Sequence, residues 1–117
     1  MAKSDPFLRV ISTPPGATSL VTIYRSEVIK DNLSPNWKPF SINAVDVGGF
    51  DAPFTVEVYD FDSDGGHDII GSTTCTLRDW TFGWWAGALQ ASGKSSSQGS
   101  LNIDNVQVRS SSRLSYK

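Results

Sequence analysis

The sequence predicts an all-β protein, an antiparallel Greek-key β-sandwich of about seven to eight strands. Three observations predict this class. Short segments rich in β-branched and aromatic residues recur along the chain, turn residues such as Gly, Pro and Asp separate them, and no long segment has the apolar spacing of a helix. The 117 residues are enough for one ordinary core but not for two, so residues 1–117 are expected to form a single domain.

The first half of the chain contains three expected strands. Residues 7–11 form the first, which Pro14-Pro15-Gly16 ends, and residues 20–24 form the second. Residues 40–42, Phe-Ser-Ile, carry apolar side chains at alternate positions and predict a short third strand before the Gly48-Gly49 break.

The clearest strand covers residues 54–59, where Phe54, Val56 and Val58 alternate with more polar side chains. This alternation predicts a strand with one buried face. A further strand, rich in Thr, is expected over residues 69–77.

The last third of the chain is less regular. Residues 78–90 contain four large aromatic side chains and are expected to form a short helix or an aromatic-tipped loop. Residues 92–100, rich in Ser and Gly, resemble a linker that leads to a closing strand with Leu101 and Ile103. Residues 109–117 form a polar tail.

Composition excludes several classes of function. The net charge is -2 and no basic run is present, so no nucleic-acid partner is expected. No apolar run is long enough for a signal peptide or a membrane span. The single cysteine, Cys75, allows no intramolecular disulfide, which fits a reducing, cytoplasmic location. Only one histidine, His67, is available to activate Cys75, so we expect a small buried residue there and no enzyme.

Residues 60–68 follow the clearest strand directly and place four carboxylates within nine residues: Asp60, Asp62, Asp64 and Asp68. Like charges this close repel one another, and a bound cation relieves the repulsion. Calcium suits the site because it takes about six to eight oxygen ligands in flexible geometry. Zinc suits it less, because only His67 offers nitrogen here. The competing interpretation is a solvated acidic turn, in which Asp and Gly serve turn geometry alone.

The spacing Asp-x-Asp-x-Asp-Gly also invites comparison with an EF-hand. That loop needs a bidentate Glu at its twelfth position and a helix on each side. Counted from Asp60, the twelfth residue is Gly71, and an expected strand precedes the loop. The EF-hand interpretation therefore fails.

Five ordered motifs make the chain resemble a C2 domain. They occupy residues 4–8 (SDPFL), 24–30 (YRSEVIK), 32–40 (NLSPNWKPF), 58–62 (VYDFD) and 67–71 (HDIIG). The residue order in these motifs, above all EVIK-x-NL-x-P-x-WKPF and DG-x-HD-x-IG, is most similar to that of the second C2 domain of copines.

The resemblance implies an eight-stranded sandwich with calcium-binding loops at one end. The ligands it implies are Asp5, Asp60, Asp62 and Asp68, with a further contribution from Asp64 or a backbone carbonyl. Ions bound there leave coordination positions for lipid phosphate oxygens and reverse the charge of that end of the domain. The function it implies is calcium-dependent binding to anionic phospholipid membranes by a peripheral module.

The chain departs from the family in one respect. C2 domains of this topology have a strand before the Ser-Asp-Pro motif, and the loop after it supplies another Asp about six residues upstream. This sequence has four residues before Asp5, so that first strand and its ligand are expected to be absent. The sheet edge exposed in this way is expected to pair with a protein partner, with a second copy, or with residues 109–117.

For several side chains the sequence allows two roles. Lys30 and Lys38 can face lipid phosphates or form ordinary solvated surface. His67 is expected to pack and hydrogen-bond within its loop rather than bind metal, and Trp84 and Trp85 to contact the core or a partner. The alternative function for the whole chain is a calcium-independent C2-fold domain that binds proteins.

Overall fold

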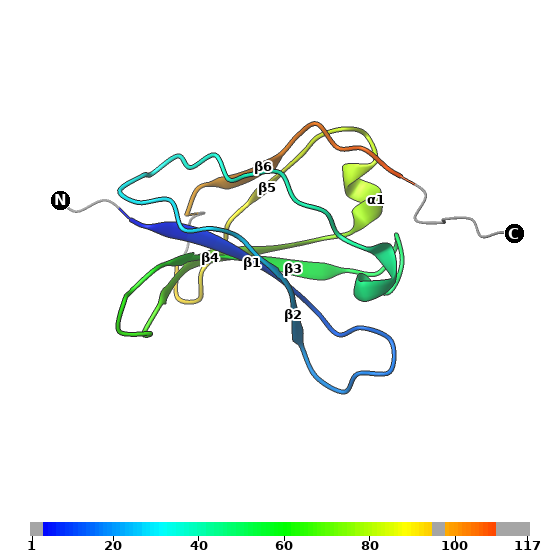
Figure 1. Ribbon diagram of the computed structural model, residues 1–117, viewed down its shortest axis with the longest axis horizontal. Coiled ribbons are helices and arrows are strands. Elements are labelled where there is room, and N and C mark those ends of the chain that lie inside the picture. Colours follow the sequence, from blue (N-terminus) through cyan, green and yellow to red (C-terminus); the bar gives the residue numbers. More distant parts are fainter. Residues whose placement is uncertain (1–3, 95–97, 110–117) are drawn as a thin grey trace, which may run out of the picture.

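The computed structural model describes residues 4–94 and 98–109, which form two facing antiparallel sheets with the hydrophobic core between them (Figure 1). The larger sheet has the strand order β2-β1-β3-β4, with β1 at Pro6–Ser12, β2 at Val21–Arg25, β3 at Phe54–Asp60 and β4 at Asp68–Cys75. The smaller sheet pairs β5, Trp85–Ala88, with β6, Ser100–Ile103. The expected all-β sandwich is confirmed, with six strands in the described part of the chain.

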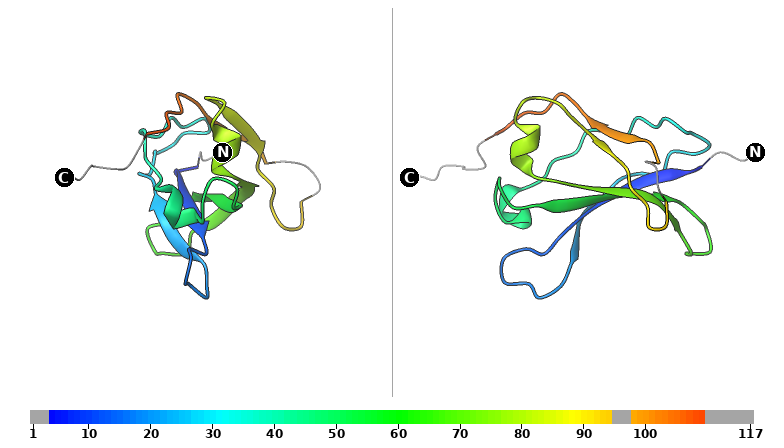
Figure 2. Two further views of the ribbon diagram at one scale, coloured as in Figure 1. Left: turned by 90° about the vertical axis from the view of Figure 1, so that its right-hand side faces the viewer. Right: turned by 180° about the vertical axis from the view of Figure 1, so that it is seen from behind.

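The two central strands of the larger sheet supply much of the core. β1 and β3 are antiparallel, with Leu8 opposite Val58 and Val10 opposite Val56, and all four side chains are buried. Six of the seven residues of β1 are buried, whereas β3 alternates between buried and half-buried positions as its sequence pattern predicts. Views from the end and from behind show these strands covered by the β5–β6 layer (Figure 2).

Residues 40–42 do not form the expected strand. Phe40 and Ile42 keep the alternation and pack, partly buried, against the core. Among the described residues, however, no backbone–backbone hydrogen bond involves residues 33–42. The segment has the side-chain pattern of a strand without a neighbouring strand to pair with, so no ladder forms.

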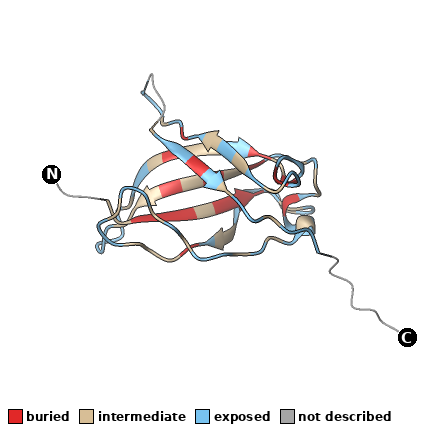
Figure 3. Ribbon diagram, turned by 90° about the horizontal axis from the view of Figure 1, so that it is seen from above, coloured by how far each residue is buried: buried red, intermediate tan, exposed pale blue. Residues whose placement is uncertain are grey.

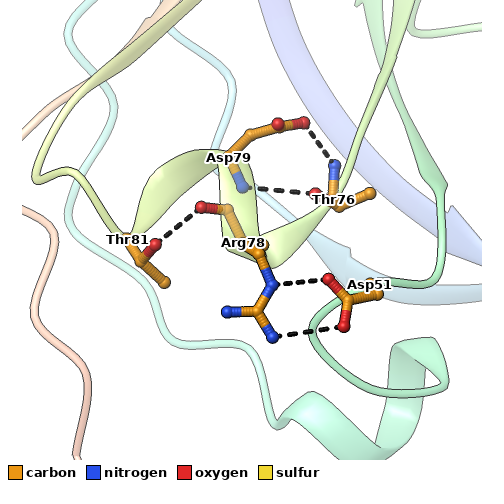
Figure 4. A network of polar contacts seen from close by, with 5 residues as sticks. All are labelled: Asp51, Thr76, Arg78, Asp79 and Thr81. Atoms are coloured by element: carbon orange, nitrogen blue, oxygen red, sulfur yellow. Dashed lines mark hydrogen bonds and ion pairs between the residues drawn. The ribbon is translucent and has the colours of Figure 1, made fainter.

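The expected short helix in residues 78–90 is α1, Leu77–Trp80, and Figure 4 shows how it is held. Thr76 and Asp79 form a capping box, in which each side chain accepts a hydrogen bond from the other residue's backbone N–H. An ion pair from Arg78 to Asp51 ties the helix to the loop that follows the 3₁₀ helix η1, Ala44–Val47.

The part of the chain after α1 contains one unexpected element. β5 follows α1, where the sequence indicated only a helix or a loop. The turn before it exposes Phe82 and Trp84, as an aromatic-tipped loop would. The predicted linker falls partly, and the polar tail mostly, outside the described residues. No helix in the described ranges is long and apolar enough to cross a membrane.

Seen from above, buried residues follow the strands that face the interior, whereas exposed residues are frequent in the connecting loops (Figure 3). The β3–β4 loop and residues 26–36 lie at the end of the molecule where the described chain begins (Figure 1). η1, α1 and the β1–β2 turn lie at the opposite end. The acidic residues of the predicted calcium site therefore belong to one end of the sandwich.

Candidate metal centre

Strand pairing brings the predicted ligands from distant parts of the sequence to one end of the sheet. β1 begins where β3 ends, with Pro6 opposite Asp60. β4 begins directly across from the same residue, with Asp68 opposite Asp60. Asp60 ends β3, Asp68 begins β4 and Asp5 directly precedes β1, so the three residues lie at one end of the larger sheet.

Two hydrogen bonds fix Asp5 against the end of β3. The backbone N–H of Asp5 donates to Asp60 Oδ1 at 2.9 Å, and the carbonyl of Asp5 accepts from the Phe61 N–H at 2.9 Å. Both Asp5 and Asp60 are half-buried. Two aspartates that are 55 positions apart in sequence are thus held next to each other.

A further acidic residue, Asp31, stands at this end and was missed by sequence reasoning. Its backbone N–H donates to Asp5 Oδ1 at 2.8 Å, and its φ of 51° is left-handed, a conformation that Asp tolerates better than most residues. The available signal was the Asp31-Asn32 pair directly after the YRSEVIK motif, because Asp and Asn are typical of turns.

Within the β3–β4 loop the carboxylates accept hydrogen bonds from nearby backbone groups. Asp62 Oδ1 accepts from the Asp64 N–H at 3.2 Å, and Asp64 Oδ1 accepts from the Gly66 N–H at 2.9 Å. These are Asx turns, and they compact the loop while Asp62, Asp64 and Asp68 stay exposed.

His67 has the loop-stabilising role expected from the sequence. Its Nδ1 accepts from the Asp62 N–H at 2.8 Å. Its ring stacks on Phe61 with centroids 4.8 Å apart and meets Phe7 edge-on at 5.2 Å. The imidazole therefore anchors the loop to the beginning of β1.

The candidate ligand atoms are of the kind that binds a hard cation such as calcium, but their arrangement does not form a complete coordination site. All the candidate ligands offer carboxylate oxygens, which calcium prefers. Across the described ranges, no three His, Cys, Asp or Glu side chains come close enough together to hold a metal ion. The carboxylates come from two loops at the same end of the molecule, but they are not close enough together to coordinate one ion. The ligand assignment therefore stays a prediction.

The two lysines predicted to face lipid differ in position. Lys30 is exposed and directly precedes Asp31, which bonds to Asp5, so it lies beside the acidic loops. Lys38 is also exposed, and its backbone N–H donates to a Glu27 carboxylate oxygen at 2.7 Å. Neither lysine forms an ion pair with another described residue, and the structure leaves their lipid role untested.

Cys75 is buried at the end of β4, as expected. Burial raises the pKa of its thiol to about 12, and the nearby Asp79 charge adds to the rise. A thiol with this pKa is protonated near neutral pH and is a poor nucleophile.

Comparisons with known proteins agree with the fold. The C2 domain family matches residues 1–96. The chain is 40% identical over 78 residues to Protein BONZAI 2 of Arabidopsis thaliana, and the match covers 67% of this chain and 13% of that protein. The chain thus spans a small part of this relative's length. A solved structure named BON1-C2B aligns with a TM-score of 0.72 at 27% identity, covering 91% of this chain and 77% of that one.

Proposed function

The chain belongs to the C2 domain family, and from this premise we propose that it is a peripheral module that binds anionic phospholipid membranes in a calcium-dependent manner. C2 domains are typically non-catalytic modules, and many bind phospholipid and calcium. We place the protein in the cytoplasm, on the membrane only when calcium is bound.

The observation that carries this proposal is the backbone hydrogen bond from Asp5 to the Asp60 carboxylate. It joins two segments that are distant in sequence at one end of the larger sheet, where Asp68 lies opposite Asp60. Several carboxylates at one end of the domain repel one another, and a cation bound between them would relieve that repulsion.

The residues at this end of the domain have different roles in the proposed site. Asp5 and Asp60 hold the two loops together, His67 fixes the shape of the β3–β4 loop, and Asp62, Asp64 and Asp68 present exposed carboxylates. Bound calcium would supply positive charge at this end and coordination positions for lipid phosphate oxygens. Lys30, beside the same loops, adds attraction for anionic headgroups.

The test combines thermal unfolding with co-sedimentation on phosphatidylserine vesicles. Calcium at about a hundred times its Kd should stabilise the parent by about 2.7 kcal/mol, a shift of several degrees in Tm. The double variant Asp60→Asn/Asp62→Asn should lose both this shift and the calcium-dependent sedimentation. Asp46→Asn/Asp104→Asn is the matched control, because it removes the same charge from exposed residues outside both loops. A calcium shift that is as large in the first variant as in the parent would overturn the site.

The second candidate is a calcium-independent C2-fold domain that binds proteins. The observation that favours it is that the described carboxylates form no group close enough to hold a metal, and that several already accept loop N–H groups. The same vesicle experiment distinguishes the two, because this candidate predicts no response to calcium in either assay.

One finer assignment, the placement of the chain with the second C2 domain of copines, stays a prediction.

A further inference from the structure

A long groove lies between β6 and the extended residues 36–43. Its volume is about 1530 Å³, above the range of about 300–1,000 Å³ that is usual for small-molecule pockets. Its lining includes Phe40, Ile42, Trp80, Leu101 and Ile103. Figure 3 shows the layer that carries β5 and β6 lying over the larger sheet. A groove of this size suits a segment of polypeptide better than a small molecule.

One wall of the groove is the free edge of β6. Leu89 donates its N–H to the Gly99 carbonyl at 2.9 Å, and the register places Gly87 opposite Leu101. Hydrogen-bonded pairs alternate along an antiparallel ladder, so Leu101 and Ile103 bond to β5. The backbone N–H and C=O groups of Ser100 and Asn102 therefore point away from β5, toward the groove, and no described strand pairs with them.

The opposite wall is the segment that was expected to be a strand. Phe40 and Ile42 are half-buried against the core, and Ser41 between them is exposed. As noted above, residues 33–42 form no backbone–backbone bond with any described residue. The groove thus lies between two segments that each turn apolar side chains toward the core and keep backbone groups unpaired. A strand laid between them can pair with both.

The charges of the groove narrow the chemistry of its occupant. Among the described residues that line it, only Lys38, Asp104 and Arg109 are charged. A strongly charged occupant would therefore lose hydration and find few partners of opposite charge. Apolar side chains at alternate positions, by contrast, can cover the apolar floor of the groove while the side chains between them face water.

We propose that this groove is a docking site for an extended, largely uncharged segment of another polypeptide, which adds a strand beside β6. A strand along residues 36–43 spans eight residues, or about 26 Å. Its backbone pairs with Ser100 and Asn102 on one side and with residues 40–42 on the other, which satisfies both unpaired edges. In this mode of recognition, main-chain hydrogen bonds supply affinity and alternate side chains supply specificity.

The site is separate from the proposed metal centre. The predicted ligands Asp5, Asp60, Asp62 and Asp68 do not line the groove. The test is therefore made in the presence of a calcium chelator, so that its outcome does not depend on calcium binding.

The test is amide hydrogen exchange of the full chain, measured residue by residue by NMR. The probe is an acetylated and amidated octapeptide in which Val and Thr alternate. When the peptide saturates the protein, the amides of Ser100 and Asn102 should exchange at least about ten-fold more slowly than in the free chain. The Leu101 and Ile103 amides, already bonded to β5, should change less and report that the sandwich persists.

Two further peptides and two variants are the controls. The octapeptide with N-methyl groups at alternate residues loses half of its donors, and the octapeptide with its Val residues grouped together loses the alternation, so neither should bind. Asn102→Pro removes the N–H that faces the groove but no bond to β5, and it should abolish binding. Asn102→Ala keeps that N–H and should bind the alternating peptide as the parent does.

Three results would overturn the proposal. Unchanged exchange at Ser100 and Asn102 with the alternating peptide would mean that the edge accepts no strand. Equal binding of the N-methylated peptide would mean apolar contact without strand pairing. Slow exchange at these amides before any peptide is added would mean that the chain itself fills the groove or, where dilution removes the protection, that a second copy does. If Asn102→Pro does not fold, the N-methylated peptide decides.

Discussion

At the scale of single residues, His67 combines packing with hydrogen bonding in the β3–β4 loop. Its ring lies between Phe61 and Phe7, and Nδ1 accepts the Asp62 N–H. A nitrogen that accepts a hydrogen bond carries no proton, so the contact fixes which ring nitrogen is bare. Because the imidazole serves the loop in this way, cation binding is left to carboxylate oxygens.

Cys75 gives a prediction at the same scale. Burial raises the pKa of the folded thiol to about 12 from an ordinary value of 9.0. At about pH 8 the folded protein should react with a thiol reagent at least about ten-fold more slowly than the unfolded protein. The unfolded chain releases its thiol proton above about pH 9 and the folded chain does not, so stability should be unaffected below that pH and fall as pH rises toward 12.

Urea unfolding at a series of pH values measures this decline, and Cys75→Ala should lack the part of it that comes from the thiol. A folded thiol that reacts as fast as the unfolded one would show that Cys75 is not shielded.

At the scale of elements, residue types and turn signals predicted β1 and β4, and side-chain alternation predicted β3, which packs one face on the core and has strands to pair with. Alternation was insufficient for residues 40–42, because a strand also needs a ladder partner and alternation carries no information on that. β5 was missed because Trp85–Ala88 consists mostly of small residues and shows little alternation. The contact of Asp5 with Asp60 depends on the pairing of β1 with β3, which no local pattern specifies.

Gly71 in β4 tests how closely the two sheets approach. A Cβ at this position would lie 2.9 Å from the Leu89 Cβ and 3.2 Å from the Gln90 carbonyl oxygen, and Ser72 next to it exchanges backbone hydrogen bonds with Gln90. Gly71→Ala should therefore push residues 89–90 away from β4 and lower the free energy of unfolding by about 1–3 kcal/mol. Thr74→Ala, on an exposed position of the same strand, is the control and should change it by less. Urea denaturation of both variants measures the difference, and equal stabilities would contradict the close approach.

At the scale of the whole molecule, the two ends of the sandwich differ in chemistry. The β3–β4 loop and residues 26–36, which include Lys30, occupy one end, whereas α1 occupies the other (Figure 1). The turn directly after α1 exposes Phe82 and Trp84. The net charge is -2, so the protein as a whole is repelled by an anionic surface. The proposed function therefore requires a local reversal of charge at the acidic end, and it predicts which end meets the membrane.

That orientation can be tested together with reversibility. In the presence of calcium the protein should co-sediment with phosphatidylserine vesicles. A chelator should release it, because removal of calcium restores the negative charge of the acidic end. Moderate salt should weaken the calcium-bound complex only in part, because direct contact between ion and phosphate is screened less than attraction over a distance. The variant Phe82→Ser/Trp84→Ser should sediment as the parent does, whereas Asp60→Asn/Asp62→Asn should stay in solution. If the aromatic variant instead lost binding and the acidic variant kept it, the membrane would contact the α1 end and the proposed orientation would be wrong.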